Sequence, residues 1–228
     1  MTNQESASVI RSDFDRIALL PDGGWNHNNH YHGFLLRQLP QRCEYALDLG
    51  CGTGSFSRLL AERCEQVLAL DLSPQMIRIA RERAKADANV EFQVADASTW
   101  AFPAERFDCI VSIATLHHLP LGEVLAKMKG ALRTGGTLGV LDLVQPEGVS
   151  GLLISALAVP VNLALRLFKT GRLRQPGLVR EVWADHGRHD SYLPLAEIRR
   201  ICVPILPGAQ IRNHLLWRCS IVWKKPAG

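Results

Sequence analysis

The chain has 228 residues, of which 47% are hydrophobic and 21% are charged, a composition that is ordinary for a soluble globular protein with one core. The polar stretch 1–16 has no apolar segment of the kind that a secretory signal peptide carries. Charge is uneven: residues 1–149 hold 14 basic and 18 acidic side chains (−4), and residues 150–228 hold 12 and 4 (+8). The basic part predicts either a solvated face or a surface that meets a membrane or an anionic substrate.

Cysteine spacing excludes the common zinc motifs. The six cysteines stand at positions 43, 51, 64, 109, 202 and 219, without a CxxC pair. We therefore expect a reducing cytoplasm, free and mostly buried thiols, and no metal site.

The N-terminal part predicts a short helical prelude to the main fold. We expect residues 1–12 to be disordered, a helix from Ser12 to Leu20, and a turn at 21–24. The run Trp25–His32 is rich in ring and amide side chains. It lies either over the opening of a site or on a surface helix whose histidine and asparagine side chains are satisfied.

From Tyr45 the chain alternates between strand and helix patterns. Strands are expected at 45–49, 66–70, 90–94, 107–112 and 137–143, helices at 55–63, 73–86 and 121–132, and a turn at 135–136. The runs 209–214 and 218–223 indicate a terminal hairpin. Repeated βα units predict an α/β fold, a doubly wound, mostly parallel seven-stranded sheet with an antiparallel C-terminal hairpin and a helical cap.

We expect a single domain whose core, 43–149, is followed by an insertion at 150–192 and by a last helix and strands at 193–228. Thirteen of the eighteen residues 151–168 are Leu, Ile, Val, Ala or Phe. The preferred interpretation is a helical cap buried over the site. The alternative is a helix on a membrane, with basic residues up to position 174 facing lipid headgroups.

The stretch Asp48–Gly54 reads as a strand, a glycine-rich turn and the start of a helix, which is typical of a nucleotide site. It departs from the dinucleotide pattern, because the third glycine comes one residue early, at Gly54. A carboxylate at Asp48 would repel a pyrophosphate but would attract an ammonium group. The ligand that suits this loop is a cationic nucleoside.

Four motifs in order, 48–54, 71–76, 95–97 and 132–138, resemble those of the class I, seven-stranded S-adenosylmethionine-dependent methyltransferases. The similarity is strongest to the small-molecule branch that includes ubiquinone and menaquinone biosynthesis enzymes. It implies S-adenosyl-L-methionine as the cofactor and S-adenosyl-L-homocysteine as the product. The cofactor contacts that it implies are Asp48, Gly50, Cys51, Gly52 and Gly54 for the methionine end, Asp71 for the ribose, Leu72 and Met76 for the adenine faces, Asp96 and Ala97 for the adenine edge, and Ala114 and Tyr31 beside them.

Five of these positions also have a plain structural interpretation. Asp48 and Asp71 could cap the helices that follow them, Leu72 and Met76 could be core residues, and Asp96 could be an exposed turn residue. The order and spacing of the motifs favour binding.

The pair His117-His118 follows the fourth strand and resembles a pair found in many small-molecule methyltransferases. We expect His118 to face the site as a general base, and His117 to pack under the next helix and hold a backbone carbonyl. Histidines 27, 30, 32, 117, 118, 186 and 189 could gather around the pocket, without the spacing of a metal site. An Asn/Asp-Pro-Pro-aromatic motif is absent here, which argues against nucleic acid as the acceptor.

The sequence thus predicts a cytoplasmic enzyme that transfers a methyl group to a small molecule by in-line displacement. A membrane-associated methyltransferase of a quinone or lipid, which would meet the membrane through 151–174, is one alternative. A cofactor-binding protein without catalysis is another, and a nicotinamide oxidoreductase is disfavoured by Asp48 and Gly54. The acceptor atom and the oligomeric state stay open.

Overall fold

The fold was analysed in a computed structural model that describes residues 3–21, 23–84, 89–188 and 190–227. Seven strands form one sheet in the order β3-β2-β1-β4-β5-β7-β6, in which β7 runs antiparallel to both of its neighbours. The strands are β1 Cys43–Leu49, β2 Cys64–Asp71, β3 Val90–Val94, β4 Phe107–Ile113, β5 Leu132–Leu143, β6 Gln210–His214 and β7 Arg218–Lys224. The predicted fold class, a doubly wound sheet with a terminal hairpin, is confirmed.

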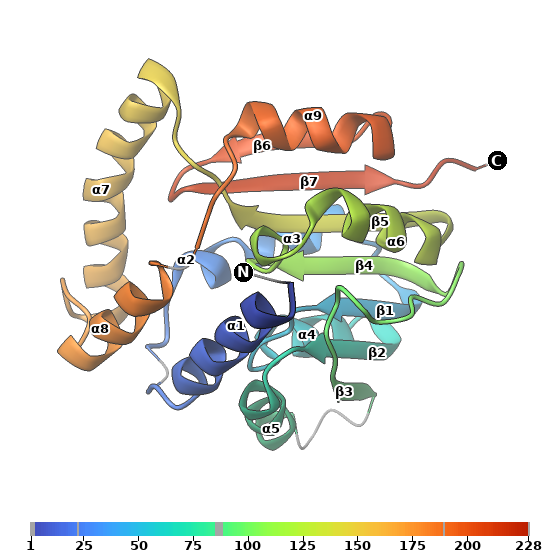
Figure 1. The fold of residues 1–228 in the computed structure, drawn as a ribbon, viewed down its shortest axis with the longest axis horizontal. Helices are drawn as coiled ribbons and strands as arrows, with labels where there is room; N and C mark the ends of the chain where they lie inside the picture. Colours follow the sequence, from blue (N-terminus) through green and yellow to red (C-terminus); the bar gives the residue numbers. More distant parts are fainter. Residues whose placement is uncertain (1–2, 22, 85–88, 189, 228) are drawn as a thin grey trace.

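Helices cover both faces of the sheet (Figure 1). They are α1 Asn3–Ala18, α2 His27–His30, α3 His32–Gln38, α4 Ser55–Ala61, α5 Pro74–Arg83, the 3₁₀ turn η1 Leu116–His118, α6 Leu121–Ala131, α7 Gly148–Thr170, α8 Gly177–His186 and α9 Leu195–Ile205. Alternate residues of a strand point to opposite faces. Leu47 and Leu49 accordingly join the core under α6 and α9, whereas Ala46 joins the core under α3 and α4.

Most predicted elements lie within a few residues of their expected places, with three corrections. The predicted disorder of 1–12 is wrong for the described residues, because α1 begins at Asn3. The predicted turn at Gly135-Gly136 lies inside β5, which starts at Leu132 and carries an irregularity in its pairing with β4. The helix that we expected to reach position 86 ends at Arg83, and 85–88 lie outside the described residues.

The prediction of free thiols is wrong for two of the six cysteines. Cys43 and Cys64 are direct neighbours in the register of β1 and β2 and form a disulfide, with Cα atoms 4.6 Å apart. The other four, at 51, 109, 202 and 219, are free and buried as expected. Sequence alone gives no pairing register, so it could not reveal that these two positions meet.

The apolar stretch 151–168 forms most of α7, and its predicted burial is wrong. The helix stands at one end of the sheet, away from the other layers (Figure 1), and its apolar side chains are exposed. By length and composition, Gly151–Thr170 is apolar enough to cross a membrane, and only 11% of its most apolar window is buried. The segment that covers the strand ends is α1, which packs on α5 and α8.

Candidate active site

The glycine-rich loop after β1 is shaped by three left-handed glycines. Gly50, Gly52 and Gly54 have φ values of +77°, +53° and +74°, which side chains with a Cβ rarely adopt. A Cβ on Gly50 would lie 2.0 Å from Oγ1 of Thr115, so the segment after β4 packs directly against this loop. A Cβ on Gly52 would meet no atom within 4 Å. The backbone at Gly52 therefore borders open space into which a ligand fits.

Asp48 lies on the α4 side of β1 and is 1% exposed. Its Oδ2 accepts a hydrogen bond of 2.6 Å from the Ser57 hydroxyl of α4. Burial raises the pKa of Asp48 to about 7, and the neighbouring Asp71 adds to the shift. Because burial disfavours the charged form, a cationic ligand nearby would restore the carboxylate.

Asp71 ends β2 and faces the glycine-rich loop. The amide of Gly52 donates to its Oδ2 at 2.8 Å, and the amide of Ser73 donates to its Oδ1 at 2.9 Å. Burial raises its pKa to about 6. Each carboxylate oxygen has a second lone pair, so Asp71 can accept two further hydrogen bonds, as a vicinal diol would supply. Ser73 is the N-cap of α5, since its hydroxyl accepts from the amide of Met76.

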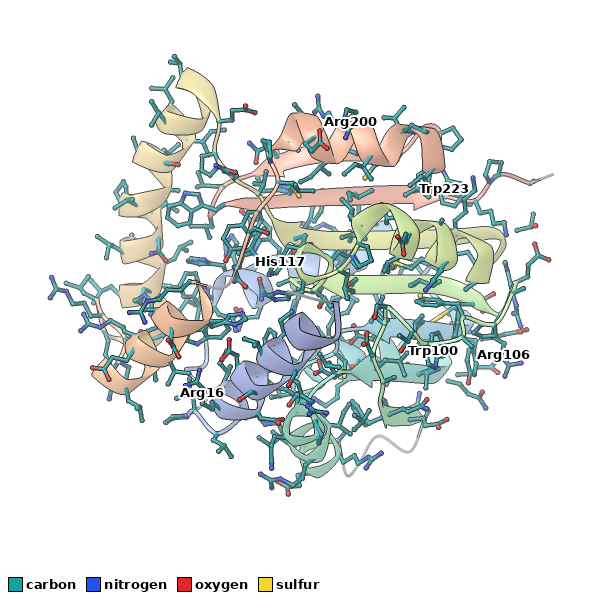
Figure 2. The ribbon with its side chains drawn as sticks, viewed as in Figure 1. Arg16, Trp100, Arg106, His117, Arg200 and Trp223 are labelled. Atoms are coloured by element: carbon teal, nitrogen blue, oxygen red, sulfur yellow. A yellow bond between two sulfur atoms is a disulfide. The ribbon has the colours of Figure 1, made fainter. Side chains whose placement is uncertain are left out.

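A second group of polar side chains lies beyond the end of β4. We call it the histidine–aspartate cluster, and its members are Asp13, His117, His118, Asp142, His186, Asp190 and Tyr192. They come from α1, η1, β5, α8 and the segment before α9. Figure 2 shows His117 at the edge of the sheet where β4 ends. Thr115, which touches Gly50, is only two residues from His117, so the cluster adjoins the glycine-rich loop.

Within the cluster, His117 is paired with a carboxylate and not with the predicted backbone carbonyl. Its Nδ1 lies 2.6 Å from Oδ1 of Asp142, and the two side chains are 6% and 9% exposed. Asp142 also accepts from the amide of Leu143. A carboxylate accepts hydrogen bonds, so Nδ1 of His117 is the donor in this contact.

His118 has one open nitrogen. Its Nδ1 lies 3.5 Å from Oδ1 of Asp190, and its side chain is 8% exposed. Its Nε2 is buried and has no hydrogen-bond partner among the described residues. Burial, together with the adjacent His117 ring at 3.9 Å, lowers the pKa of His118 to about 4. His118 is therefore neutral at physiological pH, with an unused polar atom.

Asp190 and α8 complete the cluster. Nε2 of His186 lies 3.6 Å from Oδ2 of Asp190, and its Nδ1 lies 3.2 Å from Oδ2 of Asp13. The Tyr192 hydroxyl donates to Oδ2 of Asp190 at 2.7 Å. Burial and this carboxylate raise the pKa of Tyr192, so the hydroxyl keeps its proton.

Helix α1 joins this cluster to the cofactor-type loop. Its Phe14 packs edge-on against His118 and His186, with ring centroids 5.5 and 4.8 Å apart. The next residue, Asp15, accepts a 2.6 Å hydrogen bond from the Ser73 hydroxyl beside Asp71. One helix thus lies across both halves of the site.

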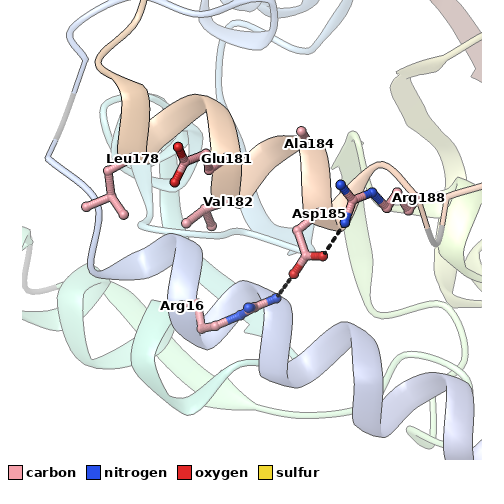
Figure 3. A pocket seen from close by; sticks show the side chains of 7 residues that line it. All are labelled: Arg16, Leu178, Glu181, Val182, Ala184, Asp185 and Arg188. Carbon is pink, nitrogen blue, oxygen red and sulfur yellow. Dashed lines mark hydrogen bonds and ion pairs between the residues drawn. The ribbon is translucent and has the colours of Figure 1, made fainter.

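A surface pocket of about 360 Å³ lies elsewhere, between α1 and α8 (Figure 3). Three of its four charged residues are engaged with one another, because Arg16 and Arg188 both bind the carboxylate of Asp185, at 2.7 and 3.2 Å. The glycine-rich loop does not line it. The candidate site lies at the strand ends, where the buried Nε2 of His118 has no hydrogen-bond partner among the described residues.

Comparison with known proteins fits this geometry. An uncharacterized methyltransferase of Mycobacterium tuberculosis is 32% identical over 209 residues, which cover 90% of this chain and 99% of that protein. The chain belongs to the class I S-adenosylmethionine-dependent methyltransferases. A family model described as a methyltransferase domain matches residues 46–136.

Solved structures share the fold of this methyltransferase. Geranyl diphosphate C-methyltransferase of Streptomyces coelicolor superposes with a TM-score of 0.68 at 12% identity, over 96% of this chain and 98% of that one. A putative methyltransferase of Haloferax volcanii, solved with an activator protein, gives 0.65 at 17% identity, over 93% and 97%. S-adenosylmethionine is the cofactor of the family.

Three further residues predicted to contact the cofactor, Met76, Cys51 and Leu72, differ in what they pack against. Met76 is buried against Ile17 and Ala18 of α1, and Cys51 packs with Ile77 of α5. Leu72 is half-buried beside Asp71. Their roles as cofactor contacts stay predictions.

Asp96 and Ala97 follow β3, where Oδ1 of Asp96 accepts from the amide and the hydroxyl of Ser98. Ala114 follows β4 with φ +51°, a conformation rare for a residue with a Cβ. Tyr31 lies apart from them, since its hydroxyl donates to the carbonyl of Leu215 in the β6–β7 turn.

The predicted gathering of histidines is confirmed for 117, 118 and 186 only. His27 contacts Asn162 of α7, and His32 packs on Phe56. His30 packs beside Tyr31, and position 189 lies outside the described residues. The residues that sequence reasoning missed are the acidic partners Asp13, Asp142 and Asp190. A signal was available for Asp142, a charged residue in the apolar run that begins at Leu138.

Proposed function

We propose that the protein transfers a methyl group from S-adenosylmethionine to a small-molecule acceptor by in-line displacement. The observation that carries this proposal is the unpartnered, buried Nε2 of His118 beside the glycine-rich loop. Left unpaired, such an atom costs about 1–3 kcal/mol. A bound acceptor that supplies the missing hydrogen bond removes this cost.

The residues at and near the glycine-rich loop fit S-adenosylmethionine, the methyl donor. Asp71 has acceptor capacity for both ribose hydroxyls, and the open side of Gly52 accommodates a chain that lies close to the backbone. Asp48 supplies a buried carboxylate that complements a positive charge. The cofactor, when bound, provides an activated methyl group on a sulfonium. We assign the methionine end to Asp48 and the loop, the ribose to Asp71, and the adenine to Leu72, Met76, Asp96 and Ala97.

The histidine–aspartate cluster fits a methyl acceptor that must lose a proton. Nε2 of His118 takes the proton from the acceptor atom, whose freed electron pair then forms the bond to the methyl group. Asp190, on the Nδ1 side, stabilises the imidazolium. His117 and Asp142 form a second imidazole–carboxylate pair next to it. General-base catalysis of this kind contributes roughly 10²- to 10⁴-fold.

The negative charges of the histidine–aspartate cluster limit the kinds of acceptor that can bind there. Asp13, Asp142 and Asp190 place three carboxylates around the imidazoles, so an anionic acceptor would be repelled. We therefore assign a neutral acceptor with an O–H or N–H group, such as a phenol, an enol or an amine. The malonyl-[acyl-carrier protein] O-methyltransferase of Paenibacillus, 41% identical over 99 residues, matches 40% of this chain and 36% of its own length, and its substrate is not carried over.

The experiment is a screen of the purified protein with S-adenosylmethionine and a panel of phenols, enols, amines, thiols and carboxylic acids, with S-adenosylhomocysteine release as the readout. We expect turnover with a neutral O–H or N–H acceptor. A protein that binds the cofactor in calorimetry and turns over only carboxylic acids contradicts the acceptor class. Tight binding of the nicotinamide cofactor and none of S-adenosylmethionine contradicts the whole proposal.

A further inference from the structure

Helix α7 presents an apolar face to solvent. Among residues 151–168, every exposed side chain is apolar: Leu152, Leu153, Ala156, Leu157, Val159, Pro160, Leu163, Ala164, Leu167 and Phe168. Leu152 is 71% exposed and Phe168 is 83% exposed. A contiguous exposed apolar stripe of this length marks an interaction surface.

Within 151–168, the polar side chains Ser155, Asn162 and Arg166 are directed toward the protein. Ser155 accepts a hydrogen bond from Nε1 of Trp217 at 3.1 Å, and Asn162 contacts His27 at 2.9 Å. Further along, the guanidinium of Arg166 lies 5.8 Å from the ring centroid of Trp25. The polarity of α7 is therefore inverted relative to a surface helix of a soluble domain, which turns its apolar stripe inward.

The charge around this face has one sign. Residues 148–180 contain five Lys or Arg and no Asp or Glu. Lys169, Arg172, Arg174 and Arg180 are exposed at the C-terminal end of α7 and in the segment that follows. Phe168, the most exposed of the apolar residues, lies beside Lys169. Apolar side chains bordered by cationic ones complement a bilayer with anionic headgroups.

We propose that α7 docks on an anionic lipid surface, with its apolar stripe among the acyl chains and its basic end at the headgroups. The helix lies along the interface and does not span the bilayer, because Ser155, Asn162 and Arg166 attach its inner side to the domain over three turns. A second copy of this chain on this face would offer the basic residues no acidic partner from its own segment 148–180, which contains no Asp or Glu.

The position of α7 decides which side of the protein faces the bilayer when the helix docks. The helix stands at the end of the sheet toward which β4 and β5 run (Figure 1). The same end carries the histidine–aspartate cluster, since η1 follows β4 and Asp142 lies near the end of β5. Docking thus turns the site toward the bilayer, and, resting on the proposed function, this favours an acceptor that is apolar enough to reside there.

The test is flotation of the full chain with two kinds of vesicle, phosphatidylcholine alone and phosphatidylcholine with about 30% phosphatidylglycerol. We expect the protein to float with the anionic vesicles, and to be released at about 0.5 M salt, where headgroup charges are screened. Leu157→Glu should lower the bound fraction about tenfold. The matched control is Val203→Glu on α9, because Val203 and Leu157 are 55% and 58% exposed, and it should float like the parent.

Cofactor binding by calorimetry and circular dichroism verify that each variant is folded, and Leu153→Gln replaces Leu157→Glu if the latter does not fold. These readouts need no acceptor, so vesicle binding is tested separately from turnover. A protein that stays with the soluble fraction for both vesicles overturns the proposal. So does a dimer in light scattering that Leu157→Glu converts to a monomer without any change in flotation.

Discussion

Nδ1 of His117 and Oδ1 of Asp142 lie 2.6 Å apart, which joins the segment after β4 to the neighbouring strand β5. The pair is almost fully buried. It fixes the orientation of the His117 ring, whose centroid lies 3.9 Å from that of the His118 ring. We propose that His117 is a positioning residue for His118, because Asp142 holds the His117 ring and that ring adjoins His118.

Replacing Asp142 by Asn tests this relationship. The amide oxygen of Asn can still accept from Leu143, but the negative charge is lost. We expect Asp142→Asn to lower kcat by about 10²-fold, with the Kd of the cofactor unchanged. Asp108→Asn is the control, because Asp108 accepts backbone hydrogen bonds at the opposite end of the sheet. Equal losses of kcat in both variants would indicate a structural role only.

His118→Gln removes the proposed base. We expect kcat to fall by about 10²- to 10⁴-fold for an acceptor that must lose a proton, and to change little for a neutral acceptor whose attacking atom carries no proton. Burial lowers the pKa of His118 to about 4, so the base is lost only as pH falls toward that value. The acid limb of kcat/KM in the parent should therefore lie well below pH 6.5. His27→Gln, outside the cluster, should retain activity, and a limb near 6.5 would contradict the assignment.

Asp71→Ala tests the ribose contact. A hydrogen bond to a charged group contributes about 1.5–3 kcal/mol, and two such bonds are lost, so the Kd of S-adenosylmethionine should rise by at least about 10²-fold. Calorimetric titration measures it. Glu65→Ala is the matched control, since Glu65 is exposed near the amino end of the same strand. An unchanged Kd in a folded Asp71→Ala protein would remove Asp71 from the site.

Asp48 makes the stability of the ligand-free protein depend on pH. Its pKa is about 7 in the folded protein against 3.8 in the unfolded chain. Between these values the folded state holds a proton that the unfolded state has released, so stability falls as pH rises through this window. The Asp48→Asn variant does not lose stability in this pH window, because Asn does not titrate. We expect its free energy of unfolding, relative to the parent, to gain up to roughly 4 kcal/mol from pH 4 to pH 8. Urea titrations at both pH values check this, and an equal difference at both would show that Asp48 is ionised throughout.

The part of the candidate site that we assign to the cofactor can be predicted from local sequence. Asp48, the three glycines and Asp71 each end or follow a strand, and parallel strands bring their carboxyl ends together whatever the rest of the chain does. The cap of α5 is equally local, since Ser73 and Pro74 occupy the positions that helix starts prefer. Such features are predictable because they depend on a few neighbouring residues and on one topology.

The acceptor half depends on long-range contacts. Asp13 meets His186 across 173 positions of the chain, and no periodicity encodes that pairing. Helix α7 shows a different limit. Its apolar stripe is visible in the sequence, but periodicity does not tell whether the stripe faces the core or solvent, and hydrophobicity alone favours the core. The contacts of Ser155 and Asn162 decide the orientation.

Helix α1 has a thermodynamic consequence. Phe14 packs on His118, in the part of the site that we assign to the acceptor, and Asp15 accepts from Ser73, beside the part that we assign to the cofactor. A ligand in one part that fixes the position of α1 therefore favours binding of a ligand in the other part. Linkage requires the effect to be equal in both directions. We expect an unreactive acceptor analogue to tighten binding of S-adenosylhomocysteine, and the latter to tighten the analogue by the same factor. Phe14→Ala should reduce this factor toward one in calorimetric titrations, and an unchanged factor would show that the two ligands communicate without α1.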